Sequence, residues 1–353
     1  MKILITGGAG FVGTNLALSF KSKYPDYEIL CFDNLKRRGS ELNLNRLKEA
    51  QVEFIHGDLR VRSDLQVVGE VDMVIDAAAE PSVLAGIDDS LDYLIHTNLN
   101  GTINLLDVAH SSSAGLIFLS TSRVYPIKTL EQVSYRVGSS RFELEEEQQL
   151  IGFSRNGVAE DFPLQGSRSF YGSSKLASEL FIEEYHSLLN LRMVINRCGV
   201  LSGPYQMGKV DQGIMVLWMA KHFWKKKLSY IGFGGEGKQV RDVLHIDDLF
   251  ELIDWQVHHI DNINGQLFNV GGGLENSCSL LELTKLCQEV TGNEIPISSV
   301  RDTRTADIPI YITDNSKVTQ QTGWSPKRDP KQLLNDIHQW FIKHEAQLKP
   351  ILS

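Results

Sequence analysis

Apolar residues along the first 198 positions occur in short runs, and longer segments with helical spacing separate these runs. Within each run the apolar residues are nearly continuous, as in strands that are covered on both faces. The predicted strands are residues 3–5, 29–32, 52–55, 73–75, 116–119 and 193–195, and the predicted helices are 11–21, 94–110 and 171–189. Strands that alternate with helices predict an α/β fold, a doubly wound parallel sheet with helices on both faces.

The turn between the first predicted strand and the first predicted helix is rich in glycine, with Gly7, Gly10 and Gly13 three residues apart. Without side chains the backbone can turn tightly and approach a pyrophosphate, which the amides and the positive end of the following helix attract. Phe11 and Val12 belong to the same turn. The pattern predicts a dinucleotide site on a Rossmann-type sheet.

Asp33 ends the second predicted strand, twenty residues after Gly13. A carboxylate at this place can accept hydrogen bonds from an adenosine ribose and would repel the 2′-phosphate of NADP, so the sequence favours NAD. Lys36, Arg37 and Arg38 follow closely and could hold that phosphate, which leaves NADP as the alternative.

The pattern changes after residue 198, where a stretch rich in Gly, Pro and Gln (199–213) precedes mixed short helices and strands. We expect residues 1–198, with returning segments around 240–270, to form the NAD-binding Rossmann domain. Residues 199–239 and 271–353 then form a smaller substrate-binding region. A long insertion before Ser169 carries the acidic run 143–147, which we interpret as a solvated helix face.

Composition removes several classes of function. The 353 residues carry a formal charge of −9, so no overall positive field would attract nucleic acid or an anionic membrane. The chain has only four cysteines, and so few thiols in a chain of this length are typical of a reduced compartment. They show no CxxC spacing, so the sequence predicts no metal cluster. No apolar run approaches the roughly 20 residues of a membrane span, and residues 1–6 are a strand pattern, not a secretory signal. We expect a cytoplasmic protein without a metal or a nucleic-acid or membrane partner.

Tyr171 and Lys175 lie four residues apart, on one face of a predicted helix. A nearby ammonium group favours the phenolate and lowers the pKa of the tyrosine, so that it can take a proton from a sugar hydroxyl. Thr121 lies at the carboxyl end of a predicted strand, where open α/β sheets build their sites, and its hydroxyl could join this proton network.

These features, in this order along almost the whole chain, resemble the extended short-chain dehydrogenase/reductases that modify nucleotide sugars. The shared segments are the glycine turn with Asp33, and residues 56–59, 77–79, 98–102, 120–125, 171–175, 237–242 and 268–272. The ordered set is far more specific than any one of its motifs.

The resemblance implies roles for individual residues. Thr121, Tyr171 and Lys175 would be catalytic, and Lys175 would also hold the nicotinamide ribose. The implied NAD-binding residues are Gly7, Gly10, Phe11, Val12, Gly13, Asp33, Asn34, Asp58, Leu59, Ala77, Ala78, Ala79, Asn98, Tyr171 and Lys175, with Asp58 and Leu59 at the adenine and Ala77 to Ala79 beside the cofactor. The implied substrate-binding residues are Thr121, Gln206, Gln212, Gln239, Arg241 and Arg304, with the two arginines on the diphosphate.

Details within the family bear on the reaction. The 4,6-dehydratases of this family usually carry Asp-Glu directly after the active-site threonine, and this chain has Ser122 and Arg123 there, which disfavours dehydration and decarboxylation. Segments 206–213, 237–245 and 307–314 and the long insertion look most like the CDP-paratose/CDP-tyvelose 2-epimerase branch. Asp76, Glu80 and Val200 depart from common family residues and leave room for a different sugar.

The resemblance therefore implies an NAD-dependent epimerase that inverts C2 of a CDP-linked hexose by transient oxidation to a 2-keto sugar, in lipopolysaccharide O-antigen biosynthesis. Tyr171 would remove the C2 hydroxyl proton, and hydride would pass to the nicotinamide and return to the other face of the sugar. Alternatives are a nucleotide-sugar 4-epimerase, a keto-reductase, or a non-catalytic NAD-binding sensor. A homodimer, or a dimer of dimers, is implied through helices 94–110 and 171–189.

Overall fold

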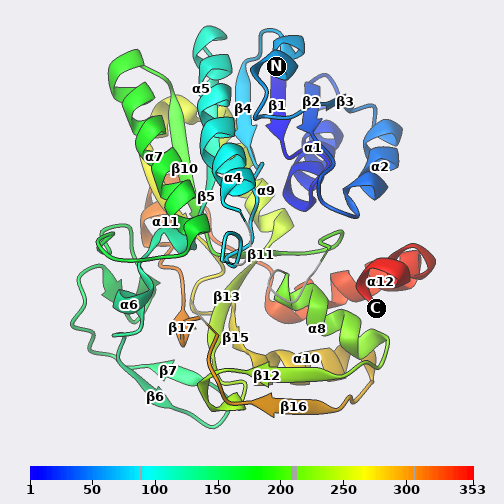
Figure 1. Cartoon of the computed structure of the whole chain (residues 1–353), viewed down its shortest axis with the longest axis vertical. Coiled ribbons are helices and arrows are strands. Elements are labelled where there is room, and N and C mark those ends of the chain that lie inside the picture. Colours follow the sequence, from blue (N-terminus) through cyan, green and yellow to red (C-terminus); the bar gives the residue numbers. More distant parts are fainter. Residues whose placement is uncertain (88–89, 208–212, 305–306) are drawn as a thin grey trace. The chain divides into compact units, whose positions relative to one another are not determined.

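The computed structural model of the chain describes residues 1–87, 90–207, 213–304 and 307–353. It contains two compact units (Figure 1). The first unit comprises Met1–Val124, Ser169–Arg197 and Leu249–Phe268, and the second comprises Tyr125–Arg168, Cys198–Asp248 and Asn269–Ser353.

A seven-stranded sheet forms the centre of the first unit, with the strand order β14-β10-β5-β4-β1-β2-β3. The pairs β1–β2, β2–β3, β1–β4 and β4–β5 are parallel. The strands are β1 (Lys2–Thr6), β2 (Glu28–Asp33), β3 (Glu53–His56), β4 (Met73–Asp76), β5 (Gly115–Thr121), β10 (Met193–Cys198) and β14 (Gln266–Val270). All six strands predicted from the apolar runs are present, and the predicted doubly wound parallel sheet is confirmed.

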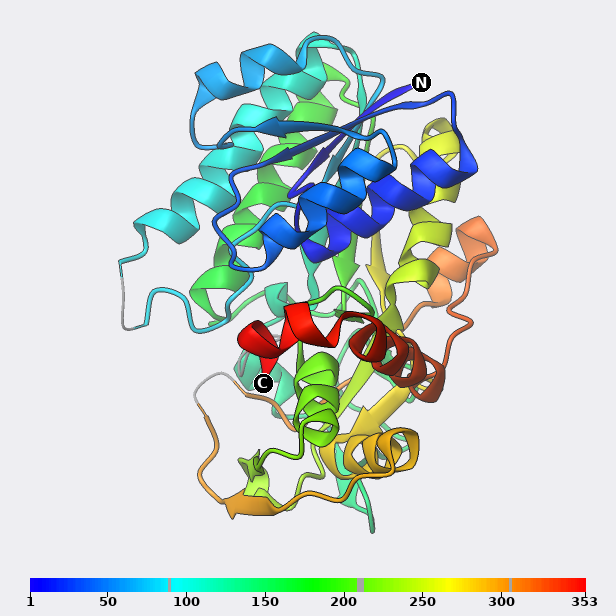
Figure 2. The same ribbon diagram turned by 90° about the vertical axis from the view of Figure 1, so that its right-hand side faces the viewer.

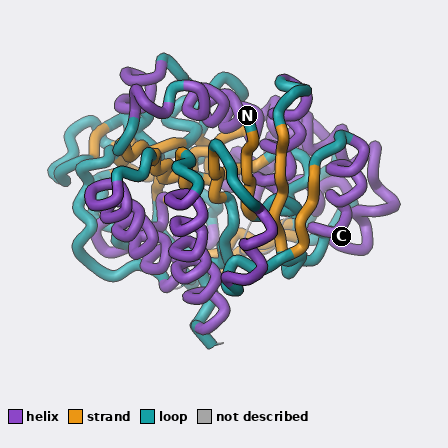
Figure 3. The backbone as a smooth tube through the Cα atoms, turned by 90° about the horizontal axis from the view of Figure 1, so that it is seen from above, coloured by secondary structure: helices purple, strands orange, loops and turns teal. Residues whose placement is uncertain are grey.

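Helices cover both faces of this sheet, as Figures 2 and 3 show. On one face α1 packs against α9, with the rings of Phe20 and Phe250 5.1 Å apart. On the other face α5 and α7 are linked by the Tyr185 hydroxyl, which donates to Asp107 at 2.6 Å. The helices are α1 (Phe11–Lys23), α2 (Asn43–Glu49), α3 (Arg62–Leu65), α4 (Asp92–Ile95), α5 (Gly101–Ser111), α7 (Phe170–Leu189) and α9 (Ile246–His258).

The core between the sheet and the α5–α7 face is apolar. Strand residues such as Leu4, Val74 and Phe118 are buried against Leu105 and Ile182 from the helices. Burial of one large apolar side chain stabilises a fold by about 1.5–3 kcal/mol, so this layer accounts for much of the stability of the first unit.

The predicted helix 94–110 is interrupted. A π-helical turn, η3 (His96–Asn100), separates α4 from α5. Within this turn Asn98 accepts a hydrogen bond from the Glu80 amide at 2.8 Å and donates to the Glu80 carbonyl and to Ser174 Oγ. The wider turn thus occurs where one side chain ties the chain after β4 to α7.

The second unit contains short sheets and helices. β13 (Val240–His245) pairs with β11 (Val200–Ser202), β15 (Ser277–Ser279) and β17 (Ile310–Tyr311), and β12 (Leu228–Ile231) pairs with β16 (Ile297–Val300). The helices are α6 (Ile127–Leu130), α8 (Ile214–Phe223), α10 (Leu280–Thr291), α11 (Ser316–Thr322) and α12 (Pro330–Leu352). Two hairpins, β6 (Tyr135–Val137) with β7 (Phe142–Leu144) and β8 (Phe153–Ser154) with β9 (Gly157–Val158), complete it.

The insertion 125–168 groups with the second unit, whereas the sequence division placed it with the first. Its backbone explains this difference, because the Phe142 amide donates to the Lys238 carbonyl and the Val158 amide donates to the Ile312 carbonyl. Segments 240–248 and 269–270 also belong to the second unit. The interpretation of residues 143–147 as a solvated helix face is wrong for the helix, because Phe142–Leu144 is a hairpin strand and residues 145–147 are not helical. Residues 145–147 are exposed, as expected.

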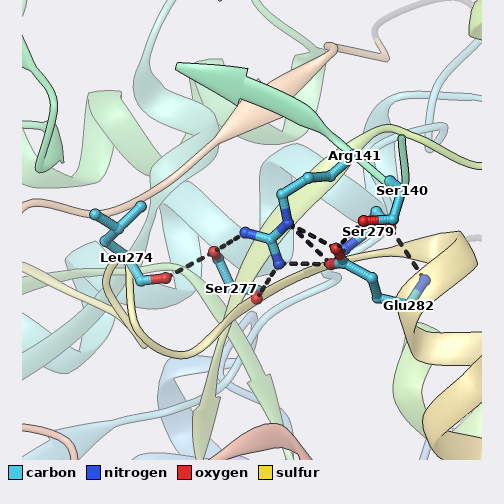
Figure 4. Close-up of polar contacts among 6 residues, drawn as sticks. All are labelled: Ser140, Arg141, Leu274, Ser277, Ser279 and Glu282. Carbon is cyan, nitrogen blue, oxygen red and sulfur yellow. Dashed lines mark hydrogen bonds and ion pairs between the residues drawn. The ribbon is translucent and has the colours of Figure 1, made fainter. Parts of the chain in front are cut away.

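Arg141 fastens this hairpin to α10 (Figure 4). Its Nε and Nη2 donate to Glu282 at 2.9 and 2.5 Å, and its Nη2 also donates to the Ser277 carbonyl at 2.7 Å. Glu282 and Ser279 form a capping box at the start of α10. Burial alone would raise the pKa of Glu282, but hydrogen bonds from Arg141, Ser140 and the Ser279 amide hold that pKa below its usual range.

Among the helices that the structure describes, none is both long enough and apolar enough to cross a bilayer.

Replacing Arg141 with Met should lower the free energy of unfolding by about 1–3 kcal/mol, since hydrogen bonds to a charged group are lost. Glu282 has a lowered folded pKa, so its contribution is present above the unfolded pKa of about 4.3 and is lost as pH falls through the folded value. Urea denaturation between neutral and acid pH should therefore show a weaker pH dependence for the variant.

Arg136 provides the matched control. It pairs with Glu143 at 2.7 Å in the same hairpin, but its side chain is 74% exposed, and such surface pairs contribute about 0–1 kcal/mol. If Arg136→Met and Arg141→Met destabilise equally, Arg141 does not fasten the insertion.

Candidate functional site

The site begins where the strand order of the sheet reverses. β1 and β4 are neighbours, with Thr6 opposite Asp76, and the chain continues from β1 into α1 and from β4 toward α5, on the other face. Open α/β sheets bind ligands in the crevice at such a point. The two turns touch through backbone, since a Cβ on Gly7 would lie 2.8 Å from the Ala77 carbonyl oxygen.

The predicted glycine turn has the geometry of an anion cradle. Gly7 has a φ of +62°, and its carbonyl accepts from the Gly10 amide at 2.9 Å. A Cβ on Gly13 would lie 2.3 Å from the same carbonyl, so a larger residue cannot replace it without moving the turn. Among the described residues no side chain caps the first turn of α1, which leaves the helix start at Phe11 and Val12 available to an anion.

Asp33 lies at the carboxyl end of β2, half-buried beside this turn. Its carboxylate accepts hydrogen bonds from the Ala9 amide at 3.1 Å and the Leu35 amide at 2.7 Å. Burial raises its pKa, and these backbone bonds oppose the shift. A carboxylate has about four acceptor positions, so Asp33 can both fix the glycine turn and accept from a ribose hydroxyl.

Asp58 follows β3 and lies close to Asn34, whose amide donates to it at 3.1 Å. Hydrogen bonds from the Arg60 guanidinium lower the pKa of Asp58 to about 2. Arg60 lies 4.8 Å from the centre of the Tyr93 ring. Next to these groups is an open pocket of about 380 Å³, lined by Asn34, His56, Gly57, Asp58, Ser63, Asp64 and Val67.

Leu59 and Asn98, two of the expected cofactor-binding residues, make contacts within the protein. Leu59 is buried in the apolar core, and its carbonyl accepts from the Asn104 side chain at 2.8 Å. Asn98 makes the contacts to Glu80 and Ser174 described above, so it holds the segment that includes Ala77, Ala78 and Ala79. This segment is half-buried directly after β4.

Asp76, a departure from the usual family residue, is fully buried. Its carboxylate accepts from the Thr6 hydroxyl at 2.7 Å, the Thr102 hydroxyl at 3.1 Å and the Ala78 amide at 3.2 Å. The side chain therefore links β1, β4 and α5 beneath the crevice, and the three donors compensate for its burial.

The three predicted catalytic residues all belong to the first unit. Thr121 ends β5 and is buried, and its hydroxyl accepts from the Arg123 amide at 3.2 Å. Tyr171 and Lys175 lie on the buried face of α7, which begins at the N-cap Ser169. The Lys175 ammonium lies 3.7 Å from the centre of the Phe118 ring, so its charge is held in an apolar setting against β5.

A buried ionic group beside these residues escaped the sequence analysis. Glu179 on α7 pairs with Arg197 on β10 at 2.7 Å, with exposed side-chain fractions of 1% and 4%. The Ser120 hydroxyl, next to Thr121, donates to the same carboxylate. Glu179 continues the four-residue spacing of Tyr171 and Lys175, and this spacing is the signal that could have revealed it.

Apart from Thr121, the predicted substrate residues that the structure describes belong to the second unit. The Gln206 side chain accepts a hydrogen bond from the Ser202 hydroxyl and donates one to the Leu201 carbonyl. The Gln239 side chain donates to the Ile231 carbonyl at 2.9 Å. Arg241 donates to Asp307 at 2.7 Å, in a partly buried ion pair. Arg304 is exposed. Gln212 lies outside the described residues.

The first unit fits NAD on three observations: the backbone cradle at Gly7 to Gly13, the carboxylate of Asp33 at the end of β2, and the pocket beside Asp58. Within the described ranges no group of three or more His, Cys, Asp or Glu side chains is arranged to hold a metal ion.

Comparison with known proteins supports this arrangement. The family model for the NAD-dependent epimerase/dehydratase family matches residues 3–271. The chain is 33% identical to a CDP-paratose 2-epimerase of Salmonella typhi, over 96% of this chain and 99% of the relative. It is 27% identical to a UDP-glucose 4-epimerase of Bacillus subtilis, over 96% of both chains.

Solved structures share the fold over nearly the whole length. A dTDP-glucose 4,6-dehydratase of Bacillus anthracis in complex with NAD superposes with a TM-score of 0.75 at 26% identity, and 99% of each chain is covered. A UDP-glucose 4-epimerase of Thermotoga maritima with UDP-glucose gives a TM-score of 0.76 at 22% identity, over 97% of this chain and 99% of the other. The resemblance inferred from the motifs is confirmed: the chain is an enzyme of the NAD-dependent epimerase/dehydratase family, and its cofactor is NAD.

Proposed function

We propose that the protein is a nucleotide-sugar epimerase that inverts C2 of a CDP-linked hexose such as CDP-paratose or CDP-tyvelose. The observation that carries this proposal is the 33% identity to a CDP-paratose 2-epimerase over 99% of that relative's length. Thr121, Tyr171 and Lys175 in one compact unit supply the groups that such a reaction needs.

Each of these residues has a defined task. Tyr171, as the phenolate, takes the proton of the C2 hydroxyl and returns it at the end of the cycle. Lys175 favours the phenolate through its charge, and the Thr121 hydroxyl forms a hydrogen bond with the reacting oxygen. NAD, when bound, would supply a reversible hydride acceptor, so the reaction would need no external reductant.

Ser122 and Arg123 support epimerisation over dehydration. The segment directly after Thr121 carries no carboxylate: Ser122–Val124 forms a single 3-10 turn, η4. Removal of water from a sugar needs an acid and a base at adjacent carbons. The second candidate is a 4-epimerase, which the 27% identity to a UDP-glucose 4-epimerase favours.

Arg241 and Arg304 are the proposed ligands of the substrate diphosphate, with Gln206, Gln212 and Gln239 as further substrate contacts. Guanidinium groups match two phosphate oxygens with two parallel hydrogen bonds. Arg241 already pairs with a carboxylate, Asp307. Binding of a diphosphate to Arg241 therefore requires an exchange of partners, or a shared arrangement in which Asp307 keeps one N–H.

A homodimer, or a dimer of dimers, through α5 and α7 is part of the proposal. Apolar side chains on α7 are unusually exposed, with Leu180 at 56%, Phe181 at 44% and Leu188 at 71%. A twofold axis that brings two copies of α5 and α7 together would cover them.

The proposed compartment is the cytoplasm, and the proposed pathway supplies sugars for lipopolysaccharide O-antigens. The four cysteines are free thiols in the structure, which agrees with a reducing compartment.

The proposed function is tested by incubating the purified protein with CDP-, UDP-, GDP- and dTDP-linked hexoses and following the stereochemistry of each sugar by NMR. We expect inversion at C2 of a CDP-sugar without consumption of added NADH or NADPH. Tyr171→Phe should lower kcat at least a hundredfold and retain NAD. Inversion at C4, a requirement for NAD(P)H, or normal turnover by Tyr171→Phe contradicts the proposal.

Asp33→Asn should weaken NAD binding about tenfold and reduce the preference for NAD over NADP, because the charged acceptor for the ribose is lost. Calorimetric titration of the apoprotein measures both affinities. Asp72→Asn is the matched control. The Asp72 carboxylate accepts a hydrogen bond from the Lys2 amide at 2.7 Å, and Asp72 directly precedes β4, at the end of β4 opposite to Asp76. Equal loss of NAD affinity in both variants would show a general effect on the fold.

The double substitution Leu180→Glu/Leu188→Glu should convert the dimer to a monomer in sedimentation experiments, because it places four charges in the covered apolar surface. Ile342→Glu, which alters an apolar side chain of α12 that is 54% exposed, should leave the dimer intact. A wild-type protein that sediments as a monomer rejects this part of the proposal.

A further inference from the structure

We propose that Glu179, Arg197 and Ser120 form a positioning group that fixes the register between α7 and β5, and so sets the distance of Tyr171 and Lys175 from Thr121. This inference rests on the proposed catalytic roles of those three residues. It concerns contacts within the first unit.

The three residues connect the elements that carry the reacting groups. Ser120 precedes Thr121 on β5, and its hydroxyl donates to Glu179 Oε1. Arg197 on β10 donates from Nη2 to Glu179 Oε2 at 2.7 Å and from Nε to both oxygens, at 3.1 and 3.2 Å. One carboxylate therefore joins α7 to two adjacent strands of the sheet.

The helix α7 connects Glu179 rigidly to Tyr171. Tyr171, Lys175 and Glu179 are spaced by four residues on the buried face of α7, so they form one stripe along a continuous helix. Residues eight apart in an α-helix are separated by about 12 Å along the axis. A rigid helix fixed at Glu179 cannot slide or rotate at Tyr171 without breaking the contacts of Glu179.

A second contact with β5 lies between the two. The Lys175 ammonium packs over the ring of Phe118 at 3.7 Å, and Phe118 is two residues before Ser120, so both side chains point to the same face of β5. Polar contacts with η3 hold α7 on its other side, through Ser174 and Ser178 to Asn98. The lateral position of α7 is thus supported by η3, and its register against β5 by Glu179.

The chemistry of the group suits positioning. A buried ion pair contributes little net stability against apolar residues of the same volume, but it is demanding in geometry. Here the carboxylate is fixed by a two-nitrogen contact from Arg197 and by a hydroxyl, all with less than a tenth of their surface exposed. A displacement of about 1 Å between reacting groups can cost roughly a hundredfold in rate.

Ser120→Ala is the mild test, since it removes one hydroxyl and leaves the ion pair intact. We expect kcat to fall roughly ten- to hundredfold, while KM and bound NAD stay within about twofold of wild type. Amide hydrogen exchange over residues 169–175 should become faster, a measurement that does not depend on turnover. Glu179→Gln should give a larger loss of kcat where it folds, because Arg197 then lacks its counter-ion.

Gln256→Leu is the matched control. Gln256 exchanges hydrogen bonds of 2.8 and 2.9 Å with Asn196, in a buried pair that joins β10 to α9. Like Ser120→Ala, this substitution removes a buried hydrogen-bonding group, but it should leave kcat and the exchange of residues 169–175 unchanged. Unchanged kcat in Ser120→Ala, or equal losses of kcat in Ser120→Ala and Gln256→Leu, overturns the positioning role.

The nucleotide sugar for this test is whichever member of the panel the wild-type protein converts. If that sugar is not a CDP-hexose, the proposed substrate is wrong and the kcat comparison still decides the positioning role. If Tyr171→Phe is fully active, the catalytic assignment fails, and the positioning inference fails with it.

Discussion

The close approach of two backbone turns at the centre of the sheet is the constraint on which the site of the first unit depends. The turn after β1 and the segment after β4 touch at Gly7 and Ala77, and a side chain at Gly7 would overlap the neighbouring carbonyl. The Gly8 position is equally crowded, since its Cβ would lie 2.5 Å from Cys31 Cβ on β2. With these contacts in place, the start of α1 is fixed beside the end of β2, where Asp33 completes the turn.

Buried polar groups support this arrangement from below. The Asp76 carboxylate accepts hydrogen bonds from the hydroxyls of Thr6 and Thr102 and so links β1, β4 and α5. The Glu179 carboxylate pairs with Arg197 and accepts a hydrogen bond from Ser120, which links α7 to the sheet. Unpaired charges at such depth would cost several kcal/mol, so each carboxylate restricts the elements around it to arrangements that keep its donors. The crevice therefore lies on a layer of polar contacts that permit few alternative positions.

The second unit differs in character. Its sheets are short, and side-chain contacts join segments far apart in sequence, as Arg141 joins the insertion to α10. Arg241, expected to face a diphosphate, is paired with Asp307, and Gln206 and Gln239 bond nearby carbonyls. No local motif in the sequence indicates these partners, which is why the family resemblance named the residues but not their contacts.

The sequence by itself determined the order of strands and helices in the first unit, the glycine turn, Asp33 and the Tyr171–Lys175 pair, because local periodicity and short fixed spacings carry each of them. Tertiary structure alone decided the π-turn at Asn98, the strand at Phe142–Leu144 in place of a helix face, and the partners of Asp76 and Glu179. Those features depend on residues that lie dozens of positions apart in the chain, and only packing brings them within hydrogen-bond distance.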